Sequence, residues 1–393
     1  MVDLDQIRKD TPGCATKVHF NNAGASLPPS CVTDSIIDYL TFEANHGGYE
    51  TADLRSDEIQ GFYQSTASLI NASSKDNIAF TSSATSAFAL ALSSISFKPG
   101  DHVLIANEDY ISNQIALLSL QSRFGIKLLR ARSLEAGGVD LHDLEQQIVE
   151  HHPKLVSITH VPTNTGLIQP VEEIGSLCKQ HGIPYLVDAC QSVGQIPVDV
   201  EKIGCDFLSA TMRKFLRGPR GAGFLYTSDK VLDQKLSPLF VDMRGAEWTS
   251  ADTFEVRTNA KRFEEWELPY ALVVGSKVAI DYAMQIGIEN IGARNKTLCD
   301  IVRSKLTSIE LRVLDLGDKL SSIITVEIPG KSADEVLQYL RNVNINTSTS
   351  HLSNAHIDFA SKKVDWALRI SPHYYNTEDE IDTLIQSLED LND

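Results

Sequence analysis

No window of eighteen apolar residues occurs in this sequence of 393 residues, so we expect no membrane-spanning segment. The first twenty residues alternate charged residues with short apolar stretches. They therefore lack the continuous apolar run that a secretory signal needs. Both absences predict a soluble protein of the cytoplasm.

Cysteine is sparse, and its six residues show neither CxxC spacing nor the Cys/His spacing of a metal site. We expect reduced, mostly buried thiols, no disulfides and no bound metal. Basic residues are also outnumbered, because 35 Lys and Arg face 52 Asp and Glu, for a formal net charge of −17. This balance argues against nucleic acid as the main partner, whereas a small anion can still bind local basic residues.

The chain has no repeat, low-complexity tract or proline-rich linker, and a regular alternation fills residues 77–227 instead. Short β-rich runs such as HVLIA, KLVSIT and PYLVDA alternate with helical periodicity at about 84–96, 141–151 and 171–181. This alternation predicts an α/β fold with a mostly parallel sheet and helices on both faces. Ligands of such sheets bind outside the carboxyl ends of the strands, so the residues that follow each strand are the candidates for a site.

A second, smaller unit is predicted towards the C-terminus. Residues 266–308 have the apolar spacing of one or two long helices interrupted near Gly287. The runs SSIITVEI and ALRIS, with helices around 333–342 and 377–391, complete an α+β pattern. We expect a large domain over 16–265 and a small domain over 266–393, with 1–15 packing nearby. The cleft between the two is the expected place for chemistry.

The run DFLSATMRKFLRGPRGAGFLY carries the strongest chemical signal. A strand ends near Thr211, and Arg213 and Lys214 then precede a Gly-Pro-Arg-Gly turn. A lysine at such a strand end becomes a nucleophilic amine if its surroundings lower its pKa. Thr211 and Arg213 can hold an anion beside it. A solvated basic turn would give the same local pattern.

An acidic residue ends the preceding apolar strand. A carboxylate at Asp188, in PYLVDACQS, is costly without a partner, and a helix cap would by itself explain it. Its pairing with Lys214, near the end of the next strand, favours a catalytic interpretation. A carboxylate can keep a pyridine nitrogen protonated and so make a cofactor ring an electron sink. Gln191 is placed to reach the same ring.

Small hydroxyl residues open a helix after the run IAFTS. The backbone N–H groups there, at Ser83, Ala84 and Thr85, can form a phosphate cradle. A simple helix cap fits this segment equally well. We interpret it as a cofactor site only because Asp188 and Lys214 occur in the same sequence.

Together and in this order, these segments resemble the class V aminotransferase family of pyridoxal-phosphate (PLP) enzymes over nearly the whole chain. The family includes cysteine desulfurases, selenocysteine lyases, cystine lyases and isopenicillin N epimerase-like proteins. The resemblance implies the fold type I PLP-dependent transferase architecture, with a mostly parallel seven-stranded sheet in the large domain and a small α+β C-terminal domain. It also implies a homodimer whose subunits share their active sites.

The resemblance assigns cofactor roles to residues. It implies that Lys214 forms the Schiff base with PLP and that Asp188 is the partner of the pyridine nitrogen. Gln191 would donate a hydrogen bond to the phenolic oxygen of the cofactor. The phosphate would be held by Ala84, Thr85, Thr211 and Arg213. Arg213 is a departure, since the family commonly has histidine before the lysine.

Other contacts follow from the same resemblance. Tyr110 falls where the family stacks an aromatic ring, usually histidine, on the cofactor. Either Thr163 or Asn164 would lie near the ring edge. Arg369, in WALRISPHYYNTEDEID, would bind the α-carboxylate of the substrate, although an arginine that ends a strand can also form a surface ion pair.

The segments NNAGASLP and HGGYETAD look like the substrate-side loops of the family. They make Asn22 and Tyr49 candidate substrate contacts, with Ala23 and Gly24 as weaker candidates. A segment near RFEEWE would cross to the neighbouring subunit. There Glu267 stands where relatives often carry a phosphate-binding threonine.

One missing residue bears on the reaction. Desulfurases that relay sulfur as a persulfide need a mobile cysteine, which the resemblance places in INTSTSHLSNAHIDF, and this segment has none. We therefore expect a carbon–sulfur β-lyase acting on a cysteine-derived L-amino acid, with Lys214 as the base. An aminotransferase or an isopenicillin N epimerase-like racemase are the alternatives, followed by a cysteine desulfurase. A PLP-fold protein without enzyme activity is disfavoured by the intact set of Asp188, Lys214 and Arg369.

Overall fold

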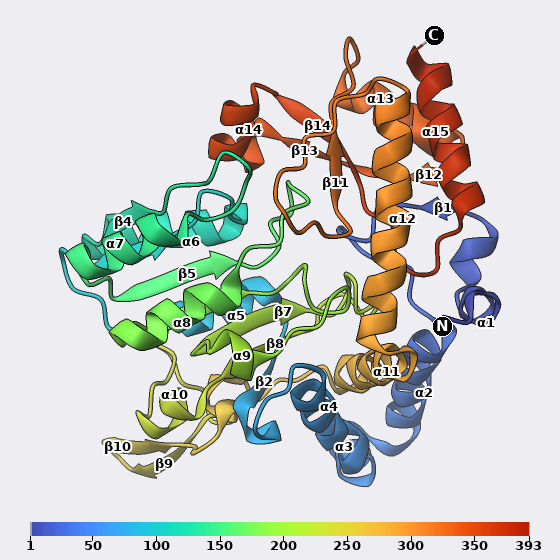
Figure 1. The fold of residues 1–393 in the computed structure, drawn as a ribbon. Helices are drawn as coiled ribbons and strands as arrows, with labels where there is room; N and C mark the ends of the chain where they lie inside the picture. The colour runs from blue at the N-terminus through green and yellow to red at the C-terminus, as the bar shows by residue number, and fades with distance from the viewer. Residues whose placement is uncertain (1, 393) are drawn as a thin grey trace.

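The structure is a computed structural model that describes residues 2–392, and a seven-stranded sheet lies at its centre (Figure 1). The strand order is β2-β8-β7-β6-β5-β3-β4. All neighbours are parallel except β8, which is antiparallel to both β2 and β7, so the predicted mostly parallel sheet is confirmed. The strands are β2 (Ile78–Thr81), β3 (His102–Ile105), β4 (Lys127–Arg130), β5 (Leu155–Thr159), β6 (Tyr185–Asp188), β7 (Phe207–Thr211) and β8 (Gly223–Thr227).

Helices cover both faces of this sheet, because successive side chains of each strand point to opposite sides. Leu104 of β3 packs in the same core as α7 (Leu141–His151) and α8 (Val171–His181). Its neighbours Val103 and Ile105 pack with α5 (Ala84–Ser93) and α6 (Ile111–Phe124). The predicted ranges of α7 and α8 are confirmed, whereas α5 ends three residues before the predicted Ser96.

The C-terminal part contains a three-stranded antiparallel sheet in the order β11-β14-β13. Apolar side chains of this sheet form one hydrophobic core with those of α12, α13 and α15. The N-terminal strand β1 (Val18–His19) pairs in parallel with β12 (Ile345–Asn346) and ties the start of the chain to this part. The other bounds here are β11 (Ile324–Val326), β13 (Ser348–His351), β14 (Trp366–Ile370), α12 (Ile288–Ser308), α13 (Ala333–Asn342), α14 (His356–Lys362) and α15 (Glu378–Asn392).

The predicted break near Gly287 separates α11 (Tyr270–Ile286) from α12, and the two helices are bent by 76°. Gly287 has φ +89, a backbone conformation that favours glycine. Within residues 2–392, no single helix is long and apolar enough to cross a membrane, and only the bent pair α11 and α12 reaches that length and composition together.

Helix α11 packs on α2 (Ser30–His46) and α4 (Ser56–Leu69), and it shares the core of α7 and α8. The domain boundary at 265/266 and the place of residues 1–15 stay predictions. The remaining elements are α1 (Leu4–Lys9), α3 (Gly48–Leu54), α9 (Val200–Ile203), α10 (Asp229–Asp233), β9 (Ala246–Ser250), β10 (Thr253–Val256), and the 3₁₀ turns η1 (Pro12–Ala15), η2 (Lys75–Asn77), η3 (Ala260–Phe263) and η4 (Leu352–Asn354).

Candidate active site

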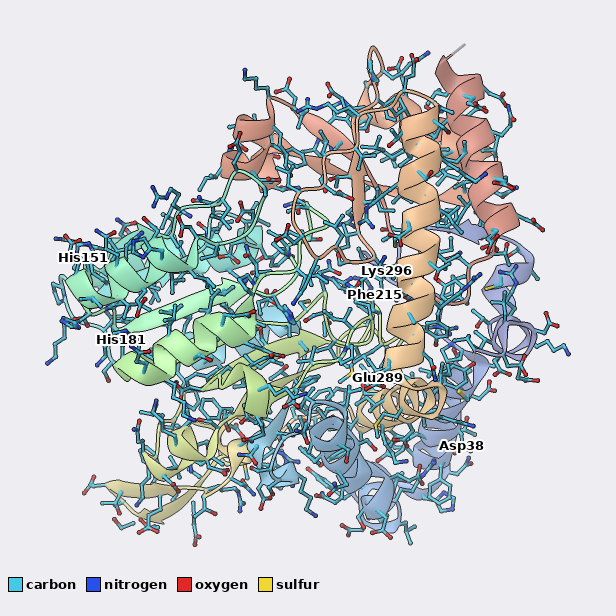
Figure 2. The ribbon with its side chains drawn as sticks, in the orientation of Figure 1. Asp38, His151, His181, Phe215, Glu289 and Lys296 are labelled. Atoms are coloured by element: carbon cyan, nitrogen blue, oxygen red, sulfur yellow. The ribbon has the colours of Figure 1, made fainter. Side chains whose placement is uncertain are left out.

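A cavity of about 290 Å³ lies at the carboxyl edge of the large sheet, where β6 and β7 end and α5 begins. His151 and His181, at the ends of α7 and α8, mark the opposite edge (Figure 2). The cavity thus lies where a parallel sheet is expected to bind its ligand. Its lining residues are Ser82, Ser83, Ala84, Thr85, Tyr110, Asn113, Asp188, Cys190, Thr211, Arg213, Lys214, Arg220 and Gly221.

The carboxylate of Asp188 is buried and held on both oxygens. Its Oδ2 accepts a hydrogen bond from Asn113 Nδ2 at 2.8 Å, and its Oδ1 accepts one from the backbone N–H of Cys190 at 2.9 Å. Burial raises the pKa of Asp188, while these two hydrogen bonds act in the opposite direction. A cationic ring nitrogen beside Asp188 would remove the cost of this buried charge.

A second buried carboxylate supports the same region. Asp109 accepts hydrogen bonds from the Thr159 hydroxyl, from the Tyr110 N–H at 2.7 Å and from Asn113 Nδ2 at 3.2 Å. Burial raises the pKa of Asp109. Asp109 therefore orients both Tyr110 and the amide that holds Asp188. Sequence reasoning missed Asp109 and Asn113, although a spacing of four at a helix start places two polar side chains on one face.

The amine of Lys214 lies 5.8 Å from the centroid of the Tyr110 ring, and the lysine is only 6% exposed. Arg213 is half-buried and donates a hydrogen bond to the Gly24 carbonyl. Arg220 also lines the cavity, so Lys214 and two guanidinium groups make its wall cationic. Arg220 and Cys190 were not predicted; the GPRG turn was the signal for Arg220.

The start of α5 forms one wall of the cavity. Ser83 is its N-cap, with a hydroxyl that accepts a hydrogen bond from Ser86 N–H at 3.0 Å. The N–H groups that follow have no partner within the helix, because they belong to its first turn. A Cβ on Gly223 would lie 2.5 Å from the Ala210 carbonyl oxygen and 2.9 Å from the Ser83 carbonyl carbon. Glycine thus allows β8 to approach β7 and the helix start.

A group of polar side chains beside this cavity centres on Thr163. Its Oγ1 accepts hydrogen bonds from Gln191 Nε2 and from Arg369 Nη1, both at 2.8 Å. Arg369 Nη2 lies 3.4 Å from the Asn21 side-chain oxygen. Arg369 Nε and Gln191 Oε1 are buried without a hydrogen-bond partner among the described residues. Burial, with the charge of Arg213, lowers the pKa of Arg369 to about 10.

Not all of the other predicted residues join the group around Thr163. Asn164 turns away from this group and donates to the Asn354 carbonyl of η4 at 3.3 Å, so Thr163 rather than Asn164 contacts Gln191 and Arg369. Asn22 donates to the Ser371 carbonyl at 2.7 Å, one residue after β14. Ala23 accepts from Gln191 at 3.1 Å.

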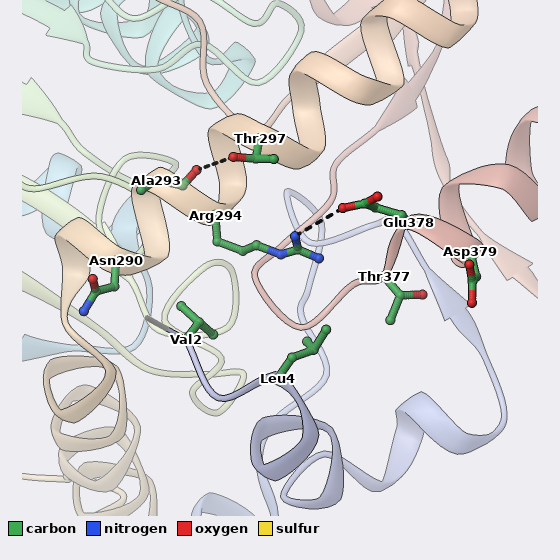
Figure 3. A pocket seen from close by; sticks show the side chains of 9 residues that line it. All are labelled: Val2, Leu4, Asn290, Ala293, Arg294, Thr297, Thr377, Glu378 and Asp379. Atoms are coloured by element: carbon green, nitrogen blue, oxygen red, sulfur yellow. Dashed lines mark hydrogen bonds and ion pairs between the residues drawn. The ribbon is translucent and has the colours of Figure 1, made fainter.

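Tyr49 lies apart, on α3, and is 73% exposed. Together with Glu267, it lines a separate pocket of about 430 Å³. A third pocket, of about 650 Å³, lies between the N-terminal residues, α12 and the start of α15 (Figure 3). Its arginine, Arg294, pairs with Glu378 at 3.7 Å, and the predicted site residues lie elsewhere.

Comparison with known proteins identifies the family. The sequence profile described as Aminotransferase class-V matches residues 18–384. The chain belongs to the class V aminotransferase family. It is a PLP-dependent enzyme with the fold type I PLP-dependent transferase fold, as predicted.

Two similar proteins are named cysteine desulfurases. A probable cysteine desulfurase of Methanothermobacter thermautotrophicus is 30% identical, over 98% of each chain. The apo structure of a cysteine desulfurase from Thermococcus onnurineus superimposes with a TM-score of 0.92 at 25% identity, covering 100% of this chain and 98% of the other. A cystine C-S lyase structure, at 21% identity and a TM-score of 0.85 over 97% and 99% of the chains, shares the fold.

The residues of the cavity fit PLP. A dianionic phosphate suits a cationic wall beside a helix N-terminus. A ring nitrogen suits the buried carboxylate of Asp188. The role of each individual residue stays a prediction.

Proposed function

We propose that this enzyme cleaves the carbon–sulfur bond of cysteine or a cysteine-derived L-amino acid by β-elimination, without a relay thiol. The single observation that carries this proposal is the make-up of the segment from β12 to α14, which holds no cysteine. The names of the desulfurase relatives support a sulfur-containing amino acid as the substrate.

In this proposal PLP lies in the cavity between Asp188 and the start of α5. Asp188 would hold the ring nitrogen, Tyr110 would stack on the ring, and Gln191 Nε2, which here donates to Thr163 and Ala23, would donate to the phenolic oxygen. Ala84, Thr85, Thr211 and Arg213 hold the phosphate. When bound, PLP withdraws electrons from the substrate Cα and acidifies the α-hydrogen.

Arg369 supplies the other fixed point, because its guanidinium can bind the α-carboxylate in a bidentate manner. Lys214 is the base that takes the α-proton, since its amine lies in the cavity wall. The Cβ–S bond then breaks, and the sulfur leaves with the bonding electron pair. Water completes the conversion to pyruvate and ammonia.

Two cysteines, one in the core of the small sheet and one in the cavity wall, support direct release of sulfur. Cys299 is 1% exposed in the core of the small sheet, and burial raises the pKa of its thiol to about 11. Cys190 lines the cavity itself, and burial raises its pKa as well. Neither is a mobile thiolate suited to carry a persulfide outward.

We also propose a homodimer whose subunits share their active sites. Large apolar side chains are exposed on two segments, with Phe240 at 86% and Trp248 at 79% before and in β9, and Tyr49 and Leu54 on α3 at 73% and 68%. Exposed apolar surface of this kind is typical of a contact between subunits. Such a contact between subunits would also bring Tyr49 or Glu267 to the cavity of the partner subunit. Location in the cytoplasm stays a prediction.

The test is product analysis of the PLP-loaded enzyme with cysteine, cystine and S-conjugated cysteine sulfoxides. Pyruvate and ammonia in equal amounts are expected, with no product from Lys214→Ala. Cys190→Ser should retain the activity. Alanine together with a protein-bound persulfide would instead identify a cysteine desulfurase, the second candidate that the relatives favour. Transamination or racemisation without pyruvate would contradict both.

A further inference from the structure

Arg217 stands three residues after Lys214 and is one of the largest fully buried side chains of the protein, with 1% exposure. Its guanidinium carbon lies 4.7 Å, 5.1 Å and 5.7 Å from the ring centroids of Tyr375, Tyr374 and Tyr282. We call these three rings the tyrosine cage. A cation that is buried so completely is stabilised by the electron-rich faces of aromatic rings.

The hydrogen bonds of Arg217 all go to neutral oxygens from distant parts of the chain. Its Nη1 donates to Tyr374 Oη at 2.7 Å, its Nε to the Leu27 carbonyl at 2.9 Å, and its Nη2 to the Thr11 hydroxyl. One side chain therefore joins the turn after β7 to the N-terminal segment and to the segment that follows β14.

The cage is also connected to the substrate side of the site. The Tyr375 hydroxyl donates to Asn22 Oδ1, and Asn22 donates to the Ser371 carbonyl at 2.7 Å. Ser371 stands two residues after Arg369 in sequence. A chain of direct contacts thus runs from the turn of Lys214 to the end of the strand that carries Arg369.

Arg217 is itself part of the turn that follows Lys214. The Arg217 backbone N–H donates to the Lys214 carbonyl at 2.8 Å, with φ +59, a conformation that residues with a side chain rarely adopt. The carbonyl of Phe215, the residue after Lys214, accepts a hydrogen bond from His373 Nε2 at 2.9 Å. The side-chain contacts of Arg217 hold this backbone conformation in place.

We propose that Arg217 is a positioning residue, which through the tyrosine cage keeps the Lys214 amine at a fixed spacing from the Arg369 guanidinium. This inference rests on the proposed roles of Lys214 and Arg369. The amine and the carboxylate site come from different sheets, so their spacing depends on contacts between the sheets. Misplacement of a catalytic group by about 1 Å can lower the rate about a hundredfold.

The test compares Arg217→Met and Arg217→Lys with a matched control, Arg262→Met. Arg262 is also 1% exposed, but its guanidinium donates to the carbonyls of Leu232, Leu236 and Asn259, away from the cavity. Thermal unfolding of all variants is measured first, and activity is assayed well below each transition. A purely structural role would reduce stability in both Met variants and leave the chemistry of both alike.

Three readouts separate positioning from stability. In Arg217→Met, kcat should fall at least about tenfold with little change in KM, and Arg217→Lys should recover part of it. The pH midpoint of the visible band of the PLP-loaded protein should shift in Arg217→Met and not in Arg262→Met. In the cofactor-free protein, hydrogen exchange at residues 212–218 should accelerate only in the Arg217 variants.

Equal kcat values in wild type and Arg217→Met, or equal losses in Arg217→Met and Arg262→Met, would overturn the proposal. An unchanged pH midpoint or unchanged exchange at 212–218 in Arg217→Met would do the same. Failure of the proposed function is distinguishable, because wild type itself would then bind no PLP or release no pyruvate, while hydrogen exchange would still report on the turn.

Discussion

Two buried arginines, Arg369 and Arg217, differ in how their charge is satisfied. Arg369 Nε has no hydrogen-bond partner within residues 2–392, and burial lowers the pKa of Arg369 to about 10. Burial disfavours the charged form of Arg217 as well, but Tyr374 and Tyr375 raise its pKa, and each of its guanidinium nitrogens has an acceptor. The comparison suggests that the incompletely bonded cation awaits an anionic ligand, whereas the fully bonded one serves the fold around it.

The sharpest test of this contrast is the catalytic effect of Arg369→Met. Loss of a bidentate partner for the α-carboxylate should lower kcat/KM about a thousandfold, or about 4 kcal/mol, mainly through KM. Steady-state kinetics with a cysteine-derived substrate measures this change. Arg294→Met, in the pocket of Figure 3, is the control and should leave kcat/KM within about twofold. An equal KM in wild type and Arg369→Met would show that Arg369 does not bind the substrate.

The effect on the free energy of unfolding should be larger for Arg217 than for Arg369, the reverse of the effect on substrate binding. Arg217→Met removes three hydrogen bonds and the tyrosine-cage contacts, so the free energy of unfolding should fall by about 3 kcal/mol. Arg369→Met removes an incompletely paired buried charge and should leave this free energy unchanged or raise it. Denaturant titrations of the two variants measure both values. A larger loss of stability in Arg369→Met would reverse the comparison.

The same contrast recurs in two buried histidines, with a smaller expected effect. His373 Nε2 donates to the Phe215 carbonyl, whereas His160 Nδ1 has no partner among the described residues. Burial lowers the pKa of His160 to about 4, below the ordinary histidine value of 6.5. At a pH between about 4 and 6.5, the unfolded chain binds a proton at this histidine that the folded protein does not bind. The free energy of unfolding should therefore fall as the pH drops below about 6.5.

At pH 5, His160 should lower the free energy of unfolding by about 2 kcal/mol relative to pH 8. Burial also lowers the pKa of His373 and of His19, so His160→Asn should reduce this part of the pH dependence by the share of His160 and not abolish it, which denaturant titrations across pH 4 to 8 would show. His142→Asn is the control, since His142 is exposed and should leave the profile as in wild type. A profile that keeps its slope in His160→Asn would exclude His160 as the source.

Much of the fold followed from the sequence because local patterns match it. In α8, the buried residues Val171, Ile174, Gly175 and Cys178 have helical spacing, and the helix ends at Gly182 in the left-handed conformation. The approach of Asp188 and Lys214 was also predictable, because adjacent parallel strands end at the same edge of the sheet. Helix α5 was predicted too long; the Ser93 and Ser94 hydroxyls donate to carbonyls of its last turn, where it ends.

Other parts of the site gave no local signal. The spacing of four puts Asp109 and Asn113 on one face, but it does not show that Asn113 also binds Asp188, 75 residues away from Asn113. Which of Thr163 and Asn164 contacts Gln191 and Arg369 likewise depended on how one loop meets η4 and β14.

The sequence by itself determined the alternating elements, the acid and the lysine at neighbouring strand ends, and the absence of a relay cysteine, because each is a matter of residue type and short-range spacing. Only the tertiary structure decided the partners of the buried charges. Arg217 reads in sequence as one more basic residue of a glycine-rich turn, like Arg220. Its burial in the tyrosine cage arises from contacts between segments that are far apart in the chain, and no local pattern encodes such contacts.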